Sequence, residues 1–362
     1  MSNLDFFIRT VSAALPSPQL NTLIHFVTDR CNARCDFCFY KDQLNSGRNE
    51  LTLDEVDTLS QKLGTLQGLL IGGGEPFLRQ DLIELVGLYI RNCNVQVVQI
   101  PTNGSLTGRA VNLAETLTAK FPKVNIAIQV SIDAIGEKHD NLRRLPGLFN
   151  KAQQTLKALT ALRSKDRRFR VLVVSVLSGS TQAGCRELAR HVQDTIKPDL
   201  HWFEPARELS GDSAPLDLSA EDIAFLEANL RSYLTGISGT STSIYANTLL
   251  NRMMAEFSMN NFAIALANAL HQTPWPMPCV AGRKIAVLYP DGALAPCELK
   301  KSVVNIRDCG YDILKALKHK DFAATRAATR RHQCDCSHGC FIPLSARMAP
   351  SQWFSLLKRS VM

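Results

Sequence analysis

The sequence predicts an α/β fold in which short parallel strands alternate with helices, followed by a smaller cysteine-rich extension. Between residues 20 and 210, six apolar segments of strand pattern alternate with segments of helical pattern. Past residue 270 this alternation stops, and a β-hairpin pattern occurs among cysteines. Strands separated by helices form a parallel sheet with helices outside, and six such units fit either an incomplete (β/α)6 barrel or an ordinary doubly wound sheet.

Each predicted strand is short and is followed by a polar or glycine-containing turn. The six strands span residues 23–27, 68–71, 95–100, 125–131, 170–177 and 200–203. One helix start is well marked, because Thr52 and Glu55 have the spacing of a capping box. Val56, Leu59 and Leu63 follow at helical spacing, so we expect a helix that begins just after Thr52.

The region after the sixth strand is predicted to form a helical bridge and then a hairpin. One amphipathic helix opens at Ser219, and residues 246–270 indicate another. Residues 285–288 and 293–296 have strand pattern on either side of a Pro-Asp-Gly turn, which predicts the hairpin. The predicted organisation is an N-terminal arm (1–19), a core barrel (20–212), a helical bridge (213–272), an auxiliary cysteine-rich domain (273–345) and a C-terminal tail helix (346–362).

The most informative motif follows the first predicted strand. Cys31, Cys35 and Cys38 stand in VTDRCNARCDFCFY with the spacing C-x3-C-x2-C. Three thiolates on one short loop can hold three irons of a [4Fe-4S] cube and leave the fourth iron open for chemistry. The alternative interpretation is a structural zinc knuckle or ordinary buried thiols, although no histidine follows at zinc-finger distance.

A glycine-rich turn follows the second predicted strand. The segment IGGGEP, residues 71–76, places three glycines and Glu75 at the carboxyl end of that strand, where open α/β sheets and barrels bind their ligands. The segment lacks a G-x-G-x-x-G or P-loop pattern, so taken alone it predicts a turn.

Together, C-N-A-R-C-D-F-C and G-G-G-E-P resemble the radical S-adenosylmethionine (SAM) superfamily. The resemblance implies the incomplete, TIM-like (β/α)6 barrel with a lateral opening, and a [4Fe-4S] cluster on Cys31, Cys35 and Cys38 that binds SAM. It also implies SAM contacts from residues near the strand ends. The glycine turn would face the methionine ammonium, and Arg143 would face the methionine carboxylate. The ribose would be contacted by Asn103, Ser131 and Asp133, and the adenine by Phe37. The expected SAM-binding residues are therefore Phe37, Gly73, Gly74, Glu75, Asn103, Ser131, Asp133 and Arg143. The alternatives are an αL turn at Asn103, a helix cap at Ser131 and Asp133, and core packing of Phe37.

A second set of cysteines lies in the C-terminal region. Four thiolates from separate segments can close a site for a [4Fe-4S] cluster or for zinc, and spacing alone does not separate these. The form C-x12-G-x4-C, with Gly292 as the glycine, resembles the shortened SPASM or "twitch" extension of radical SAM enzymes, which implies one auxiliary [4Fe-4S] cluster. The candidate ligands are Cys279, Cys297, Cys334, Cys336 and Cys340, of which either Cys334 or Cys336 is the extra one. Cys309 stands in a strand-to-helix turn and is not predicted as a ligand.

Composition narrows the class of protein. At 362 residues and 45% hydrophobic, the chain can bury a full core. No uninterrupted apolar stretch reaches about eighteen residues, so no membrane span is expected. Eleven cysteines gathered toward the two ends argue for metal binding in a reducing compartment, hence for a cytoplasmic, oxygen-sensitive protein. The net charge of +8 has its densest patch at residues 163–170, which is typical of a solvated turn, and no nucleic-acid motif is present.

The resemblance implies an enzyme that cleaves SAM reductively and removes hydrogen from a substrate C–H bond, using a flavodoxin- or ferredoxin-like one-electron donor. The auxiliary cluster would accept an electron or position the substrate, which is expected to be a small polar molecule (sugar, alcohol or nucleotide) or a ribosomal peptide. No catalytic residue is assigned, and Glu204, Arg207 and His201 are candidates by position alone. The alternatives are a non-catalytic electron-transfer protein and a structural zinc protein.

Overall fold

The computed structural model describes residues 19–163, 168–207, 215–236, 249–331 and 336–353. Most of the predicted N-terminal arm, the end of the predicted tail helix and Cys334 lie outside these ranges. No helix in the described ranges is both long enough and apolar enough to cross a membrane.

Within the described residues, nine strands form one sheet in the order β6-β5-β4-β3-β2-β1-β7-β8-β9. The first six run parallel: β1 (Thr22–Phe26), β2 (Gly68–Gly72), β3 (Val97–Thr102), β4 (Asn125–Ser131), β5 (Phe169–Leu177) and β6 (Leu200–Pro205). Each bound lies within two residues of the predicted one, so the six predicted strands are confirmed.

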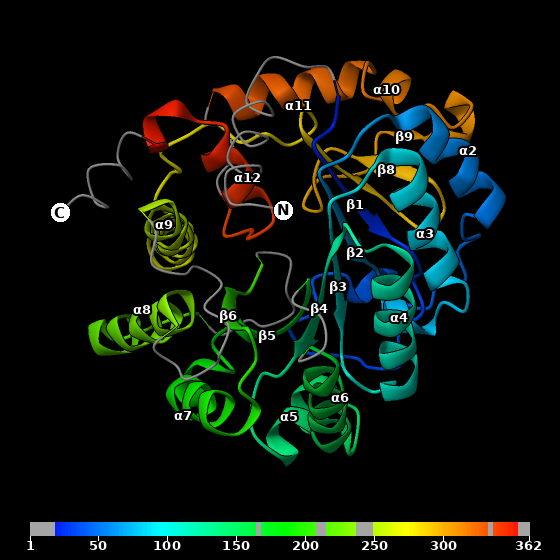
Figure 1. Ribbon diagram of the computed structural model, residues 1–362. Coiled ribbons are helices and arrows are strands. Elements are labelled where there is room, and N and C mark those ends of the chain that lie inside the picture. Colours follow the sequence, from blue (N-terminus) through cyan, green and yellow to red (C-terminus); the bar gives the residue numbers. More distant parts are fainter. Residues whose placement is uncertain (1–18, 164–167, 208–214, 237–248, 332–335, 354–362) are drawn as a thin grey trace.

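Helices follow the strands in turn and lie on the outer side of the curved sheet (Figure 1). They are α2 (Leu53–Leu63), α3 (Leu82–Cys93), α4 (Thr107–Lys120), α5 (Glu137–Arg143), α6 (Leu148–Arg163), α7 (Cys185–His191) and α8 (Ala220–Thr235). Short turns of helix, η1 (Lys41–Gln43), η2 (Pro76–Leu78), η3 (Gln182–Gly184) and η4 (Val192–Ile196), punctuate the connections. This arrangement confirms the incomplete (β/α)6 barrel.

Both predicted helix starts are capped as their sequences indicate. The Thr52 hydroxyl accepts the Glu55 N–H at 3.2 Å, and the Glu55 carboxylate accepts the Thr52 N–H at 2.9 Å. Ser219 and Asp222 form the same reciprocal box at the start of α8. Such caps satisfy backbone N–H groups that have no partner inside the helix. The second predicted bridge helix is α9 (Leu249–His271).

The C-terminal region extends the sheet beyond β1. Strand β7 (Ile285–Leu288) pairs in parallel with β1, and β8 (Ala293–Ala295) returns antiparallel to β7, which confirms the predicted hairpin. Gly292 in its turn has φ +82°, and a Cβ atom there would lie 2.9 Å from Asn305 Oδ1. The remaining elements are β9 (Val304–Asn305), η5 (Ile306–Cys309), α10 (Ile313–Ala316), α11 (Lys320–Arg330) and α12 (Phe341–Arg347).

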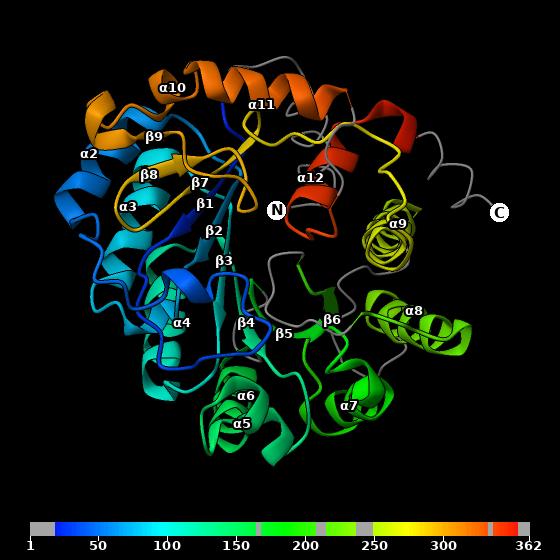
Figure 2. The same cartoon turned by 180° about the vertical axis from the view of Figure 1, so that it is seen from behind.

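The C-terminal region also reaches the opposite edge of the six-stranded sheet. Helices α8 and α9 pack against β6, and α12 packs against α9 (Figure 2). One buried apolar cluster fills the barrel and its helices, and a second joins β7 and α12 to residues near the cysteines. The barrel and its extension are therefore bound together at both β1 and β6.

Candidate functional site

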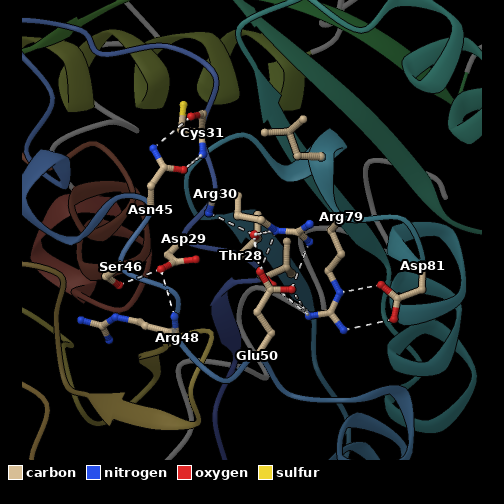
Figure 3. A network of polar contacts seen from close by, with 12 residues as sticks. Thr28, Asp29, Arg30, Cys31, Asn45, Ser46, Arg48, Glu50, Arg79 and Asp81 are labelled. Atoms are coloured by element: carbon tan, nitrogen blue, oxygen red, sulfur yellow. Dashed lines mark hydrogen bonds and ion pairs between the residues drawn. The ribbon is translucent and has the colours of Figure 1, made fainter.

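The loop that carries the first three cysteines is anchored where it leaves β1. The Thr28 hydroxyl donates to Glu50 at 2.5 Å, and Arg30 pairs with the same carboxylate at 3.3 Å. Arg79, whose side chain is 4% exposed, donates to the Val27 carbonyl at 2.8 Å. Figure 3 shows these side chains converging below the loop. The network fixes the direction in which the chain enters the cysteine segment.

A second group of contacts folds the far end of the loop back onto its start (Figure 3). The Asn45 side chain accepts the Cys31 N–H at 3.0 Å and donates to the Cys31 carbonyl at 3.2 Å. Asp29 accepts from the Ser46 hydroxyl at 2.7 Å and from the Arg48 N–H at 3.3 Å. The cysteine segment is thus a closed loop held by side chains as well as by its own backbone.

The glycine turn after β2 lies directly against the cysteine loop. A Cβ atom on Gly73 would lie 2.4 Å from the Thr28 carbonyl oxygen, and one on Gly74 would lie 2.2 Å from that of Arg30. The Gly74 N–H donates to Thr28 O at 2.9 Å, and the Glu75 N–H donates to Arg30 O at 2.8 Å. Only glycine permits this contact between two backbones, so both motifs belong to one site.

Glu75 is buried at the centre of this site. One of its oxygens accepts from the Thr102 hydroxyl at 2.9 Å and from the Phe77 N–H at 3.2 Å, and the other accepts from the Asn103 N–H at 2.7 Å. Burial raises the pKa of Glu75 to about 7 in spite of these donors, and its charge acts on Cys31. Its position suits an acceptor for a cation.

Asn103, predicted to face a ribose, is tied to the cysteine loop. Its side-chain Nδ2 donates to the Asn32 side chain at 2.8 Å, and its side-chain Oδ1 accepts the Ser105 N–H at 2.9 Å. The Asn32 amide in turn donates to the Ser105 hydroxyl at 2.9 Å. Asn32 stands between Cys31 and Cys35, so the β3 end holds the loop from a second side.

Three further predicted residues meet at the end of β4. Arg143 Nε donates to Asp133 Oδ2 at 2.6 Å, and the guanidinium carbon lies 5.7 Å from the centre of the Phe37 ring. The Arg143 carbonyl accepts the Arg34 N–H at 3.0 Å, which connects α5 to the cysteine loop. Ser131, the last residue of β4, is half-buried and pairs with Val174 of β5. Asp133 and Arg143 were assigned to different parts of SAM, and the structure pairs them with each other.

The three thiols of the loop are partly buried, and burial by itself favours their protonated form. Burial raises the pKa of Cys31 to about 12 and that of Cys35 to about 11, and it also raises the pKa of Cys38. The Ala33 N–H donates to Cys31 Sγ at 3.4 Å, and Arg143 lies close enough to lower the pKa of Cys35. An iron ion bound at these sulfurs would reverse the effect of burial, because it deprotonates its thiol ligands.

In the described residues, no three His, Cys, Asp or Glu side chains lie close enough to hold a single metal ion. A cube of four irons is wider than one ion, since each thiolate binds a different iron.

The second cysteine set is more deeply buried. Cys279, Cys297 and Cys336 are 8%, 7% and 5% exposed and share one buried cluster, against which Cys340 packs. The Ala281 N–H donates to Cys279 Sγ at 3.4 Å, and the Leu299 N–H donates to Cys297 Sγ at 3.4 Å. Burial raises the pKa of Cys340 well above its usual range. The N–H donor two residues beyond the cysteine is therefore shared by Cys31, Cys279 and Cys297.

Other cysteines have different surroundings. The Cys93 thiol donates to the Ser60 carbonyl at 3.2 Å, the role of a protonated group. Cys185 is buried at the start of α7, and Cys309 packs against the barrel core rather than beside the C-terminal thiols. None of the three was predicted as a ligand, and none belongs to the buried apolar cluster that contains Cys279, Cys297 and Cys336.

The end of β6 joins the two cysteine sets. Arg207 forms an ion pair with Glu298, and the same carboxylate lies 2.9 Å from His338 Nε2. Glu204 accepts the Gly339 N–H at 2.7 Å. Sequence reasoning missed Glu298 and His338, although the first directly follows Cys297 and the second stands between Cys336 and Cys340.

His201, the third residue named by position, lies away from this group. Its Nε2 bonds the Ser175 hydroxyl at 2.8 Å between β5 and β6, and burial lowers its pKa to about 3. The imidazole is therefore neutral and packed inside the sheet.

Comparisons with known proteins agree with this geometry. Residues 26–192 match the family model described as the radical SAM superfamily. Fe-coproporphyrin III synthase of Methanosarcina barkeri is 33% identical over 36% of this chain and 31% of its own length. GTP 3',8-cyclase of Shewanella denitrificans is 36% identical over 31% of this chain and 32% of its own length. The chain thus spans about a third of the length of these curated relatives.

Two solved structures have a similar fold over most of the chain. The structure of native anSMEcpe with bound AdoMet has a TM-score of 0.60 at 15% identity and covers 94% of this chain and 98% of its own. Streptococcus suis SuiB bound to S-adenosylmethionine has a TM-score of 0.57 at 14% identity and covers 90% of this chain and 72% of its own. Both similarities include the C-terminal region.

Proposed function

Because residues 26–192 belong to the radical SAM superfamily, we propose that this chain is an enzyme that cleaves SAM reductively and removes a hydrogen atom from a C–H bond of its substrate. The bound cluster would supply the electron that breaks the sulfonium bond, and the resulting 5'-deoxyadenosyl radical would take the hydrogen. The observation that carries the proposal is the contact between the cysteine loop and the glycine turn, which brings Cys31 close to Glu75.

Different residues of this site are proposed to bind different parts of SAM. Cys31, Cys35 and Cys38 would hold a [4Fe-4S] cluster through three of its irons, and the fourth iron would be left for the methionine amino and carboxylate groups. Gly73, Gly74 and Glu75 offer acceptors to the N–H groups of that amine. Asn103 and Ser131 lie at strand ends suited to the ribose, and Phe37 offers its ring to the adenine.

Arg143 is proposed to bind the methionine carboxylate, with Asp133 as its support. Asp133 accepts from Nε and from the Val176 N–H at 2.8 Å, which fixes the guanidinium plane. The two terminal nitrogens can then form a bidentate pair with the carboxylate. This modifies the initial assignment of Asp133 to the ribose.

We infer that Cys279, Cys297, Cys336 and Cys340 bind one auxiliary [4Fe-4S] cluster. Two observations support this ligand set. The four cysteines lie in or against one buried apolar core, and backbone N–H groups donate to Cys279 and Cys297. Cys334 remains the alternative to Cys336 and lies outside the described residues. A fully liganded cluster would pass electrons, as an oxidation of the substrate radical requires.

The substrate is proposed to be a small polar molecule or a ribosomal peptide, and the electron donor a flavodoxin- or ferredoxin-like protein. The names of the relatives support the first class, since GTP 3',8-cyclase names a nucleotide. The second class is supported by the similar fold of SuiB, whose structure was also solved with its precursor peptide SuiA.

Anaerobic reconstitution with iron and sulfide tests the proposal. Two cubes predict about eight irons per chain, whereas a zinc protein would bind none. Addition of SAM and dithionite should release 5'-deoxyadenosine from the wild-type protein and from C309A, a matched cysteine variant outside both sets, but not from C35A. Two loaded clusters with no 5'-deoxyadenosine would instead favour an electron-transfer protein.

A further inference from the structure

Arg207 lies between the two cysteine sets, at the point where the chain leaves β6. Its guanidinium carbon is 3.9 Å from the centre of the Phe39 ring, and Phe39 directly follows Cys38. On its other side Arg207 pairs with Glu298, which directly follows Cys297. The ion pair therefore spans the distance between the first cysteine loop and the second set.

The two charges of this pair have different neighbours. The guanidinium lies against the residue next to Cys38, whereas the carboxylate lies 2.9 Å from His338 Nε2. His338 Nδ1 accepts the Cys340 N–H at 3.3 Å, which places the carboxylate end beside the second set. The carboxylate thus lies beside the auxiliary site, whereas the guanidinium lies between the two sites, against Phe39 of the first loop and close enough to Cys340 to lower the pKa of that thiol.

The surroundings hold this orientation. The side chains of Arg207 and Glu298 are 16% and 3% exposed. Glu204 accepts the Gly339 N–H at 2.7 Å, and a Cβ atom on Gly339 would lie 2.3 Å from the Glu204 carboxylate. The Ser337 hydroxyl donates to the Ala206 carbonyl at 3.4 Å. These contacts fix the end of β6 against residues 337–339, next to the ion pair.

We propose that the Arg207–Glu298 pair separates the reduction potentials of the two iron–sulfur sites, raising that of the N-terminal site relative to that of the auxiliary site. This inference rests on the proposed function. Reduction adds one negative charge to a cluster, so a nearby cation favours the reduced form and a nearby anion opposes it. Arg207 and Glu298 would therefore act on the two clusters through their charges, as positioning residues.

The effects on the nearby thiols have the same signs. Burial raises the pKa of Cys38, whereas Arg143, Arg207 and Lys41 act to lower it, and no anion is among the main influences on that thiol. At Cys340, Glu298 raises the pKa more strongly than Arg207 lowers it, and Glu204 adds to the rise. Burial lowers the local dielectric constant, so the electrostatic effect of each charge on its neighbours is larger than it would be in water.

The difference in reduction potential determines which of the two clusters is reduced first. When the external donor gives up one electron, the donor is oxidised and the cluster with the higher reduction potential is reduced. With the N-terminal site favoured, the electron stays where SAM binds, and the auxiliary site remains oxidised and able to accept an electron later.

EPR-monitored redox titration of the reconstituted full-length protein tests this proposal, with the N-terminal site identified as the one whose spectrum changes on addition of SAM. In R207M the N-terminal potential should fall by an amount equal to about a tenfold change in the reduction equilibrium, or 59 mV for one electron. R207K should retain the wild-type potential. In the double variant R207M/E298Q the difference between the two potentials should shrink.

The matched control is R186M, which removes an arginine that is paired with Asp222 between α7 and α8 and follows Cys185, a residue of neither candidate ligand set. Its potentials should equal those of the wild type. If R207M does not load its clusters, E298Q, which keeps the side-chain shape, should raise the auxiliary potential more than the N-terminal one. Unmoved potentials in E298Q, or R207K behaving like R207M, would overturn this inference alone. A wild-type protein without SAM-responsive iron would instead overturn the proposed function.

Discussion

Asp133 Oδ2 and Arg143 Nε form a buried hydrogen-bonded ion pair at 2.6 Å, with Asp133 fully buried and the Arg143 side chain 9% exposed. The pair joins the end of β4 to α5, and α5 holds the cysteine loop through the Arg143 carbonyl. A single buried pair thus orients a candidate SAM-binding cation and also supports the loop that carries the thiols.

Replacing Asp133 with alanine should therefore affect both stability and binding. The buried guanidinium would lose its partner, and we expect the free energy of unfolding to fall by about 3–5 kcal/mol. We expect the affinity of the reconstituted protein for SAM to fall about tenfold, or roughly 1.4 kcal/mol. Urea unfolding and SAM titration measure the two effects.

A neighbouring Asp–Arg pair provides the control for stability. Asp36 and Arg144 lie 2.5 Å apart but are 41% and 65% exposed, so D36A should cost less than about 1 kcal/mol. Equal losses in D133A and D36A would contradict the role given to burial.

Replacing Gly74 with alanine should separate the two halves of the site. The added methyl group would lie 2.2 Å from the Arg30 carbonyl, so the glycine turn or the cysteine loop must move. We expect SAM affinity to fall at least about tenfold while the spectrum of the auxiliary site is unchanged. The control is G108A in α4, where nothing lies within 4 Å of the added methyl group. Wild-type SAM binding by G74A would contradict this account.

Local patterns were enough to predict much of this fold. Strand spacing, the Thr52 and Ser219 caps and the Gly292 turn depend on residues close together in the chain, so a short window contains the physical cause. The cysteine loop and the glycine turn were also evident, because each is a short motif with its own chemistry.

The relations that the sequence did not predict all join distant segments. The pairing of β7 with β1 and the ion pair of Arg207 with Glu298 each depend on how the barrel closes, which no local pattern encodes. The Asp133–Arg143 pair is closer in sequence, but both residues suited a ligand role, and residue type alone does not reveal that they meet. The roles of Glu298 and His338 emerge only when the cysteine sets are placed beside β6.

Replacing Cys336 with alanine should remove the auxiliary cluster. We expect bound iron to fall from about eight to about four per chain, with the SAM-responsive EPR signal retained. C309A should keep the full complement, because Cys309 packs against the barrel core instead of the C-terminal thiols. Iron analysis with EPR distinguishes the outcomes, and full iron content in C336A with loss in C334A would assign the ligand to Cys334.

The docking of the C-terminal extension on α2 should weaken at low pH. Arg307 donates to Glu55 at 2.6 Å and Tyr311 donates to the same carboxylate at 3.0 Å. The hydrogen bond from Arg307 is the main cause that lowers the pKa of Glu55 to about 2 from a usual value of 4.5. A lowered carboxyl pKa stabilises the folded state above the unfolded pKa, and this stabilisation is lost as pH falls through the folded one.

We therefore expect E55Q to be less stable than the wild type at pH 7, with a difference that narrows between about pH 5 and pH 2. Urea unfolding of both proteins across this range measures the difference, which cancels the titration of groups common to both. E115Q, on an exposed position of α4, should be as stable as the wild type at pH 7. A difference between E55Q and wild type that stays constant down to pH 2 would show that the ionised Glu55 carboxylate does not hold the extension on α2.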